Sequence, residues 1–454
     1  MLDIKIINGL LVMNNGINRI DVGIKGEKIF TIGKHISEKA KRVIDADGKV
    51  IIPGCFDVHT HPVYLDDVYD LSISAVYGGV TTLIHYAYAY PGSKLIDVLK
   101  KFKEDGQQRS ILDFGLHGGI FDAKNQVSEI PKAMSLGVTS FKFFMAYAKL
   151  GWMTDDYHLI KAFDVISANK GMAIVHAESG LAIDYLEDKL RLSNRDPRKE
   201  FEKSRPGLLE AEAVNRVCVF SKITNCPLYI PHISAKETVS VITKAKNEGV
   251  HIYAETCPQY LLLTSEETIR QGARAKIGPP LRSDDDRIAL WNALQSGVID
   301  VVASDHAPKA KEVQDEFWEA PYGAPQTETM LPLLYHYGVN QGFITLRRLV
   351  EVMCEAPAKI WGLYPNKGTI AIGSDADLVI LDPSIQWTIS SSNQHSKANY
   401  TLYEGWQCLG KPIMVIQRGE ILMEKDELLA KPGRGRFLPT RAGQSWPLYR
   451  RTNA

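Results

Sequence analysis

Eight short runs rich in apolar and β-branched residues alternate with stretches of helical periodicity between residues 51 and 308. Such alternation is typical of parallel βα units, because each parallel strand needs a long crossover, usually a helix, before the next strand. Eight consecutive units predict an α/β fold with a (β/α)8 TIM barrel. The runs are IIPGCFDVHTH (51–61), TTLIHYAYAY (81–90), ILDFGLHGGI (111–120), SFKFFMAY (140–147), MAIVHAES (172–179), PLYIPHIS (227–234), HIYAETCPQYLLL (251–263) and DVVASDHAP (300–308).

β-rich segments flank the predicted barrel on both sides. Residues 1–52 alternate apolar and polar positions between turns such as Asn-Gly, which predicts half-exposed antiparallel strands. The same character returns from about residue 368, in GTIAIGSDADLVILDP and PIMVIQRGEILME. We therefore expect a β-sandwich domain built from 1–52 and 363–430, a barrel over 53–362, and an extended Pro/Gly/Arg-rich tail over 431–454, along a surface or a neighbouring subunit.

The composition argues against several classes of partner. Lys+Arg and Asp+Glu both number 53 among 454 residues, and this balance gives no support for a surface that binds nucleic acid or anionic membranes. No apolar run is long enough to span a bilayer, and the start MLDIKIINGL lacks the profile of a signal peptide. Six scattered cysteines without a C-x-x-C spacing favour a reducing, cytoplasmic setting.

Metal-capable side chains recur at the C-terminal ends of the predicted strands, where catalytic groups converge in such barrels. His59 and His61 are two residues apart, so on one strand both side chains point to the same side. Four imidazoles and a carboxylate on this rim would suit two divalent ions such as zinc. The candidate ligands are His59 and His61 from the first run, Lys142 from the fourth, His176 from the fifth, His232 from the sixth and Asp305 from the eighth.

Lys142 is the unusual member of this set, because an unpaired ammonium inside a barrel costs several kcal/mol, on the order of 5. A lysine that reacts with carbon dioxide becomes an anionic carbamate, which behaves as a carboxylate on a long arm. Such a group can bridge two metal ions roughly 3.5–4 Å apart. We therefore expect Lys142 to be modified to N6-carboxylysine.

Each of these residues also has a purely structural interpretation. A single histidine at a strand end is more often a satisfied structural residue than a ligand, a buried lysine usually extends its amine to solvent, and Asp305 could cap a helix. We assign the remaining candidates to this structural class; they are His85, His117, His251, His306 and His336. The pair in DVHTH is moderately specific alone, whereas six such residues in strand order are hard to produce by chance.

Motifs along nearly the whole chain resemble the dihydropyrimidinase/hydantoinase family of cyclic amidases, in the amidohydrolase superfamily. FMAY after Lys142 is the most discriminating of them, because allantoinases and dihydroorotases carry other residues there. The motifs are PGCFDVHTH, GGVTTLIHYAYAYPG, SFKFFMAY, VHAES, LEAEAVNRV, PLYIPHIS, TCPQYLLLT, GPPLR, ASDHAP and GTIAIGSDADLVILD.

The resemblance implies a role for each candidate residue. The first histidine pair would bind the more buried metal, His176 and His232 the other, and carbamylated Lys142 would bridge both. Asp305 would complete the first site and carry the proton, while Tyr147 would donate a hydrogen bond to the oxygen of the scissile amide. Family members hold the ring amide through main-chain groups of a Ser and an Asn; those positions are Gly278 and Tyr322 here. The metals are expected to be Zn²⁺, with Mn²⁺ as the alternative, and the assembly a homotetramer.

The expected reaction is metal-dependent hydrolysis of a cyclic amide to an N-carbamoyl amino acid by a hydroxide that two metals activate. No arginine follows the HTH motif, unlike in dihydroorotases, so an uncharged 5-substituted hydantoin or dihydropyrimidine is favoured. Apolar rim residues suggest an apolar ring substituent; they are Val63, Tyr64, Leu65, Phe144, Leu150, Trp152 and Met153. The alternatives are an allantoinase-type cyclic ureide hydrolase and a non-catalytic scaffold relative, although every ligand is retained.

Overall fold

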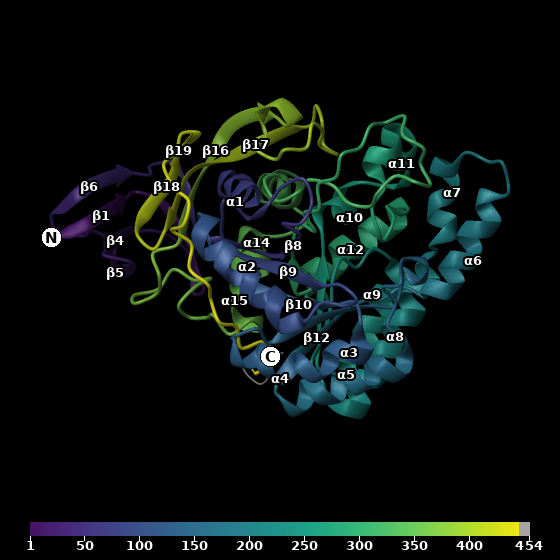
Figure 1. The fold of residues 1–454 in the computed structure, drawn as a ribbon. Helices are drawn as coiled ribbons and strands as arrows, with labels where there is room; N and C mark the ends of the chain where they lie inside the picture. Colours follow the sequence, from purple (N-terminus) through teal and green to yellow (C-terminus); the bar gives the residue numbers. More distant parts are fainter. Residues whose placement is uncertain (445–454) are drawn as a thin grey trace.

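A barrel of eight parallel strands forms the centre of the protein, and the computed structural model describes residues 1–444 (Figure 1). Each strand pairs with its neighbours in sequence, and a parallel bridge between Thr60 and His306 joins the first strand to the segment after the last. The predicted fold class is confirmed. The strands are β8 (Cys55–Thr60), β9 (Val80–Ala89), β10 (Asp113–Ile120), β11 (Ser140–Phe144), β12 (Met172–His176), β13 (Leu228–Ile230), β14 (Ile252–Thr256) and β15 (Val301–Val302).

Two of the predicted runs are divided in the structure. In the first run, β7 (Val50–Pro53) belongs to another sheet, and Gly54 separates it from β8. A Cβ at Gly54 would lie 2.1 Å from Oγ1 of Thr81, so only glycine permits this close passage between the two sheets. In the seventh run the strand stops at Thr256, and α10 (Pro258–Leu262) begins with a proline, which suits the first turn of a helix.

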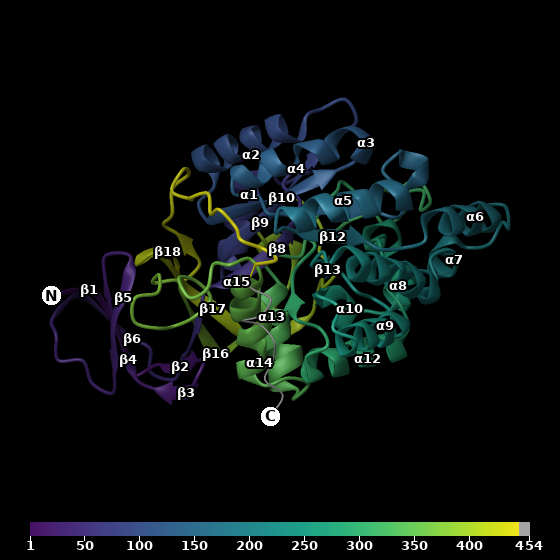
Figure 2. The same ribbon diagram turned by 90° about the horizontal axis from the view of Figure 1, so that it is seen from below.

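Helices surround the barrel strands, as Figures 1 and 2 show. Two π-helical stretches, Leu334–Asn340 and Glu351–Glu355, continue α13 and α14 near the end of the barrel. The helices are α1 (Val68–Tyr77), α2 (Leu95–Arg109), α3 (Ala123–Gln126), α4 (Ile130–Ser135), α5 (Asp156–Ala168), α6 (Gly180–Arg191), α7 (Pro197–Ser204), α8 (Gly207–Thr224), α9 (Lys236–Asn247), α10, α11 (Ser265–Gln271), α12 (Asp284–Ser296), α13 (Met330–Leu333), α14 (Leu346–Val350) and α15 (Ala356–Ile360).

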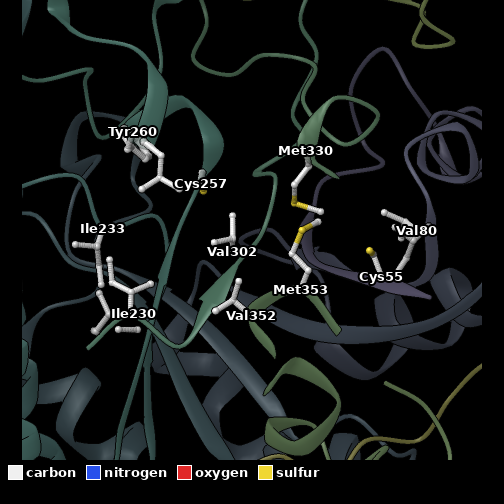
Figure 3. Close-up of a cluster of buried hydrophobic side chains, with 14 of the residues drawn as sticks. Cys55, Val80, Ile230, Ile233, Cys257, Tyr260, Val302, Met330, Val352 and Met353 are labelled. Atoms are coloured by element: carbon white, nitrogen blue, oxygen red, sulfur yellow. The ribbon is translucent and has the colours of Figure 1, made fainter. Parts of the chain in front are cut away.

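The main hydrophobic core lies between the strands and this helical layer. Figure 3 shows part of it: the side chains of Met330 and Met353 point toward each other, and Val302 and Val352 lie beside them. All four are almost fully buried. Since burial of each such side chain contributes about 1.5–3 kcal/mol, this layer supports the strand ends that carry the site.

Two further sheets form the β-rich part, seen beside the barrel in Figure 1. They are mixed rather than purely antiparallel, because β1 pairs in parallel with β6, and β2 with β7. One sheet holds β5 (Lys28–Gly33), β4 (Asp21–Lys25), β1 (Leu2–Ile7) and β6 (Ala40–Asp45). The other holds β19 (Glu427–Leu428), β18 (Glu420–Glu424), β17 (Gln407–Gln417), β16 (Leu378–Thr388), β7, β2 (Leu10–Met13) and β3 (Gly16–Arg19).

The described part of the tail, residues 431–444, lies against the barrel of its own chain. Phe437 bridges to Phe114 of β10, and Oγ1 of Thr440 lies 2.8 Å from Oγ1 of Thr139. The remainder of the predicted tail, 445–454, lies outside the described residues. Within the part of the chain that is described, no helix combines the length and apolar character needed to cross a bilayer.

Candidate active site

All six candidate ligands line a single cavity of about 210 Å³ at the C-terminal end of the barrel strands. His59, Lys142 and His176 lie within β8, β11 and β12. The other three ligands follow strand ends closely, in the segments after β8, β13 and β15; they are His61, His232 and Asp305. The strand-end positions in the sequence therefore converge because parallel strands of a barrel end on the same rim.

His59, His61 and Asp305 form a compact three-ligand group whose donor atoms lie within 4.8 Å of one another. Oδ1 of Asp305 lies 3.2 Å from Nε2 of His59 and 3.0 Å from Nε2 of His61. Two imidazoles and a carboxylate are a donor set that zinc and similar ions accept.

His176 and His232 form a second group in the same cavity. Nδ1 of His176 lies 3.1 Å from Nε2 of His232, and the ring of His232 is centred 5.3 Å from that of His59. The two groups are therefore neighbours, with Lys142 lining the cavity beside both.

In three of the four imidazoles, one ring nitrogen contacts a neighbouring side chain. The other ring nitrogen then faces another candidate metal ligand. Nδ1 of His59 lies 2.6 Å from Oε1 of Glu255, and Nδ1 of His61 lies 3.0 Å from the Tyr88 hydroxyl. Nε2 of His176 lies 2.6 Å from Oε2 of Glu178. Such contacts orient metal-binding imidazoles and select the tautomer.

Sequence reasoning did not single out these partners. Glu255 accepts a hydrogen bond of 2.7 Å from Tyr229, and Glu178 accepts one of 3.1 Å from Nε of Arg205. The sequence did contain a signal for both acids. Glu255 lies in the seventh predicted run, and Glu178 stands two residues after His176.

The charge states of the cavity suit a cation. Burial lowers the pKa of all four imidazoles below the usual value, so each is neutral and keeps a free lone pair. Burial alone would raise the pKa of Asp305, but the facing His59 and His61 hold it below the usual value, so the carboxyl is ionised. Neutral imidazoles and an ionised carboxylate fit divalent metal ions.

Lys142 is buried in this cavity, and burial lowers the pKa of its amine to about 8. Its Nζ lies 5.2 Å and 5.3 Å from the ring centres of Tyr86 and Phe144, and no carboxylate among the described residues forms an ion pair with it. Because a neutral amine is the form that reacts with carbon dioxide, this environment is compatible with a carbamate.

Three cavity residues other than glycine adopt left-handed backbone conformations. The φ angles are 64° at Tyr147, 42° at His232 and 54° at Asp305. Such conformations cost about 1–3 kcal/mol each and persist where the surrounding structure imposes them, often at functional sites.

Tyr147, Gly278 and Tyr322 meet on one side of the cavity. The two tyrosine rings are centred 5.7 Å apart, and a Cβ at Gly278 would lie 2.7 Å from the Tyr147 hydroxyl. The absence of a side chain at 278 thus leaves room for this phenol. Burial raises the pKa of Tyr147, so its hydroxyl remains protonated and can donate.

The apolar rim residues divide into two sets. Tyr64, Phe144, Leu150 and Trp152 line the cavity, together with Tyr88, Phe121 and Lys309, which sequence reasoning did not single out. Leu65 is not among the lining residues; its partly buried side chain packs against the main hydrophobic core, which removes apolar surface from water. Val63 is also outside the lining, and Met153 lines a separate cavity.

Histidines assigned to the structural class have protein partners instead of cavity positions. His85 lies 2.8 Å from the Thr60 hydroxyl, His117 contacts the carbonyl oxygen of Val58 at 2.9 Å, and His306 pairs with Asp66 at 2.9 Å. Leu409 donates its backbone N–H to Nδ1 of His336.

Comparison with known proteins shows that this chain is similar to enzymes over nearly its whole length. The model of the amidohydrolase family matches residues 158–422. The chain is 37% identical to a D-hydantoinase of Ralstonia pickettii, over 97% of this chain and 99% of that protein. It is 32% identical to a dihydropyrimidinase of Rattus norvegicus, over 96% and 88%. A solved D-hydantoinase structure superposes with a TM-score of 0.93 at 37% identity, covering 97% of this chain and all (100%) of the other.

Proposed function

Because this chain belongs to the amidohydrolase family, among the hydantoinases and dihydropyrimidinases, we propose that it hydrolyses a 5-substituted hydantoin or a dihydropyrimidine to the N-carbamoyl amino acid. The chain is a cyclic amidohydrolase. The observation that carries the substrate proposal is the convergence of four neutral imidazoles, Lys142, Asp305 and Tyr147 in one cavity of about 210 Å³.

The donor set supports two divalent metal ions, Zn²⁺ or Mn²⁺. His59, His61 and Asp305 would hold one ion, and His176 and His232 the other, with carbamylated Lys142 between them. When bound, such ions supply Lewis acidity and lower the pKa of a coordinated water toward neutrality. Carbon dioxide is then a second requirement, because it converts the Lys142 amine into an anion that is compatible with two cations.

The chain's own residues provide proton transfer and charge stabilisation. The ionised Asp305 accepts a proton from the attacking water and delivers it to the leaving ring nitrogen, the role of a general acid–base. The protonated Tyr147 donates a hydrogen bond to the carbonyl oxygen as negative charge develops on it. Main-chain groups at Gly278 and Tyr322 border the same space and would hold the ring amide, with Phe144 against its substituent.

A hydrolysis panel tests this function and its alternatives. Purified protein, with metal content measured, is incubated with hydantoin, D- and L-5-substituted hydantoins, dihydrouracil, allantoin and dihydroorotate. We expect turnover of a hydantoin or dihydrouracil. Preferential turnover of allantoin would favour the allantoinase alternative, and a metal-loaded protein that hydrolyses none of them would favour the scaffold alternative.

We also propose a cytoplasmic homotetramer. Apolar side chains exposed on α6, directly after it and at the start of α8 support self-association: Leu181, Tyr185, Leu192 and Leu208 are each at least 66% exposed. Analytical ultracentrifugation at micromolar concentration should give a tetramer, and a monomer would contradict the proposal.

A further inference from the structure

Lys309 is a cation that lines the candidate active site but has no place in the chemistry proposed above. It follows Asp305 by four residues, so the segment after β15 carries both side chains to the same cavity. Its Nζ lies over the ring of Tyr64, another lining residue, whose own ring is centred 6.2 Å from that of His61.

No carboxylate in residues 1–444 forms an ion pair with Lys309, and residues 445–454 contain no Asp or Glu. Two buried cations elsewhere have polar partners: Arg205 pairs with Glu178, and Nζ of Lys276 donates to the carbonyl oxygen of Trp318 at 2.6 Å. Burial lowers the pKa of Lys309 to about 8, so the ammonium form still predominates at neutral pH. A partly desolvated charge without a counterion is costly, and it is a natural site for an anion.

Among the described residues that line the cavity, Asp305 is the one carboxylate, and it is already engaged. Oδ1 of Asp305 lies within 3.2 Å of both His59 and His61, on the side of the candidate metal ligands. It therefore does not neutralise Lys309, whose charge remains available to a ligand that extends away from the reacting centre.

The remaining wall is aromatic, formed by residues such as Phe121, Phe144 and Trp152. The ring centre of Phe121 lies 5.2 Å from that of Phe144 and 4.7 Å from that of Trp152. These rings form a surface suited to the apolar part of a ring substituent. We propose that Lys309 is a specificity residue that pairs with a carboxylate at the end of the substrate's ring substituent. The preferred substrates are then cyclic ureides with an acidic side chain, in contrast to the uncharged substrates that the sequence favoured, an inference that rests on the proposed function.

The test compares two nearly isosteric substrates, hydantoin-5-propionate and its neutral carboxamide, each as separate enantiomers. Their kcat/KM values are measured for the zinc-loaded wild type and for Lys309→Met, which keeps the length of the side chain but removes its charge. Lys309→Arg tests rescue by a second cation. Lys124→Met is the matched control, because Lys124 follows β10 on the same rim but is exposed and does not line the cavity.

We expect the wild type to favour the acid over the amide by about 10-fold or more, the range for hydrogen bonds to charged groups. Lys309→Met should reduce this ratio by about 10- to 100-fold, while Lys309→Arg and Lys124→Met retain most of it. Equal kcat/KM values for the two compounds in the wild type, or an equal loss of preference in Lys124→Met, would overturn the proposal.

Calorimetric binding of the same two compounds separates this inference from the proposed function. If neither compound is hydrolysed, the hydrolase proposal fails for them, but tighter binding of the acid that disappears in Lys309→Met still supports the role of Lys309. Hydrolysis without any charge preference in binding or kcat/KM would overturn the role of Lys309 and leave the hydrolase proposal intact.

Discussion

Lys142 presents its amine to a cavity that also holds four imidazoles and Asp305. As an ammonium it would repel metal ions, whereas a carbamate would supply one negative charge to the proposed pair of ions. Lys142→Ala should therefore lose metal and nearly all activity, and Lys142→Arg should fare no better, because guanidinium stays cationic. Metal analysis and steady-state assays measure the metal content and the turnover of both variants.

Dependence on carbon dioxide gives an independent check on Lys142. Metal-free protein reconstituted with zinc should regain activity faster with bicarbonate than in degassed buffer. A fully active, metal-loaded protein whose Lys142 is unmodified in a crystal structure would rule out the bridging role.

Tyr147 is the second residue whose chemistry can be isolated. Its hydroxyl lies beside the backbone of Gly278, and its raised pKa keeps it a donor throughout the neutral range. Tyr147→Phe should lower kcat by roughly 10²-fold or more with metal content intact, because one oxyanion donor is lost. Unchanged kcat in steady-state assays would assign Tyr147 a structural role.

At the scale of elements, several barrel strands supply a candidate ligand, and β9 and β14 supply side chains that contact a candidate ligand of another strand. Glu255 on β14 contacts His59 of β8 and also accepts the backbone N–H of His232 at 3.1 Å, so one carboxylate orients both candidate metal groups.

Glu255→Gln should weaken zinc binding by about 10- to 100-fold, the usual cost of removing a carboxylate that supports a metal-binding imidazole. Competition with a zinc chelator measures the affinity. Tyr229→Phe is the matched control, because it removes only the hydrogen bond to the far oxygen of Glu255 and should cost less. Equal losses in the two variants would indicate a general packing defect.

At the scale of the whole molecule, a buried ion cluster joins the barrel to the β-rich part. Nζ of Lys367 lies 2.9 Å from Asp113 of β10, 3.2 Å from Asp375 and 2.7 Å from Asp377. Burial alone would lower the pKa of Lys367, but Asp377 and Asp113 raise it above the usual value. A raised pKa means that this stabilisation is present at neutral pH and is lost only as the pH rises through the strongly alkaline range.

Lys367→Met should lower the free energy of unfolding by about 3–5 kcal/mol, because it leaves the buried carboxylate of Asp377 without a cation and removes one cation from Asp113 and Asp375. Urea denaturation measures the change. Lys28→Met is the matched control, because Lys28 pairs with the same Asp375 at 2.7 Å but is about half exposed. This substitution should lower the free energy of unfolding by about 1 kcal/mol or less. A similar small change for both variants would contradict the structural role of the cluster.

Local patterns were sufficient to predict the barrel and to nominate the candidate ligands, but they did not reveal the parallel pairs β1–β6 and β2–β7 in the β-rich part. Strand-length apolar runs and helical periodicity depend on neighbouring residues alone, and the barrel they predicted is confirmed. The same patterns misjudged two run boundaries, at Gly54 and at Pro258, because a sheet change and a helix start depend on contacts outside the run. His59, Lys142 and Asp305 were accessible from sequence because each lies at a strand end.

The sequence by itself determined the eight βα units and the order of chemically capable residues at their ends, since both follow from local periodicity. Only the tertiary structure decided which distant side chains meet. The contact of Glu255 with His59 spans 196 residues, Lys309 reaches the cavity while Leu65 packs into the core, and three cavity residues adopt left-handed backbone. These features depend on barrel closure, strand register and loop direction, which arise from long-range packing rather than from any short segment.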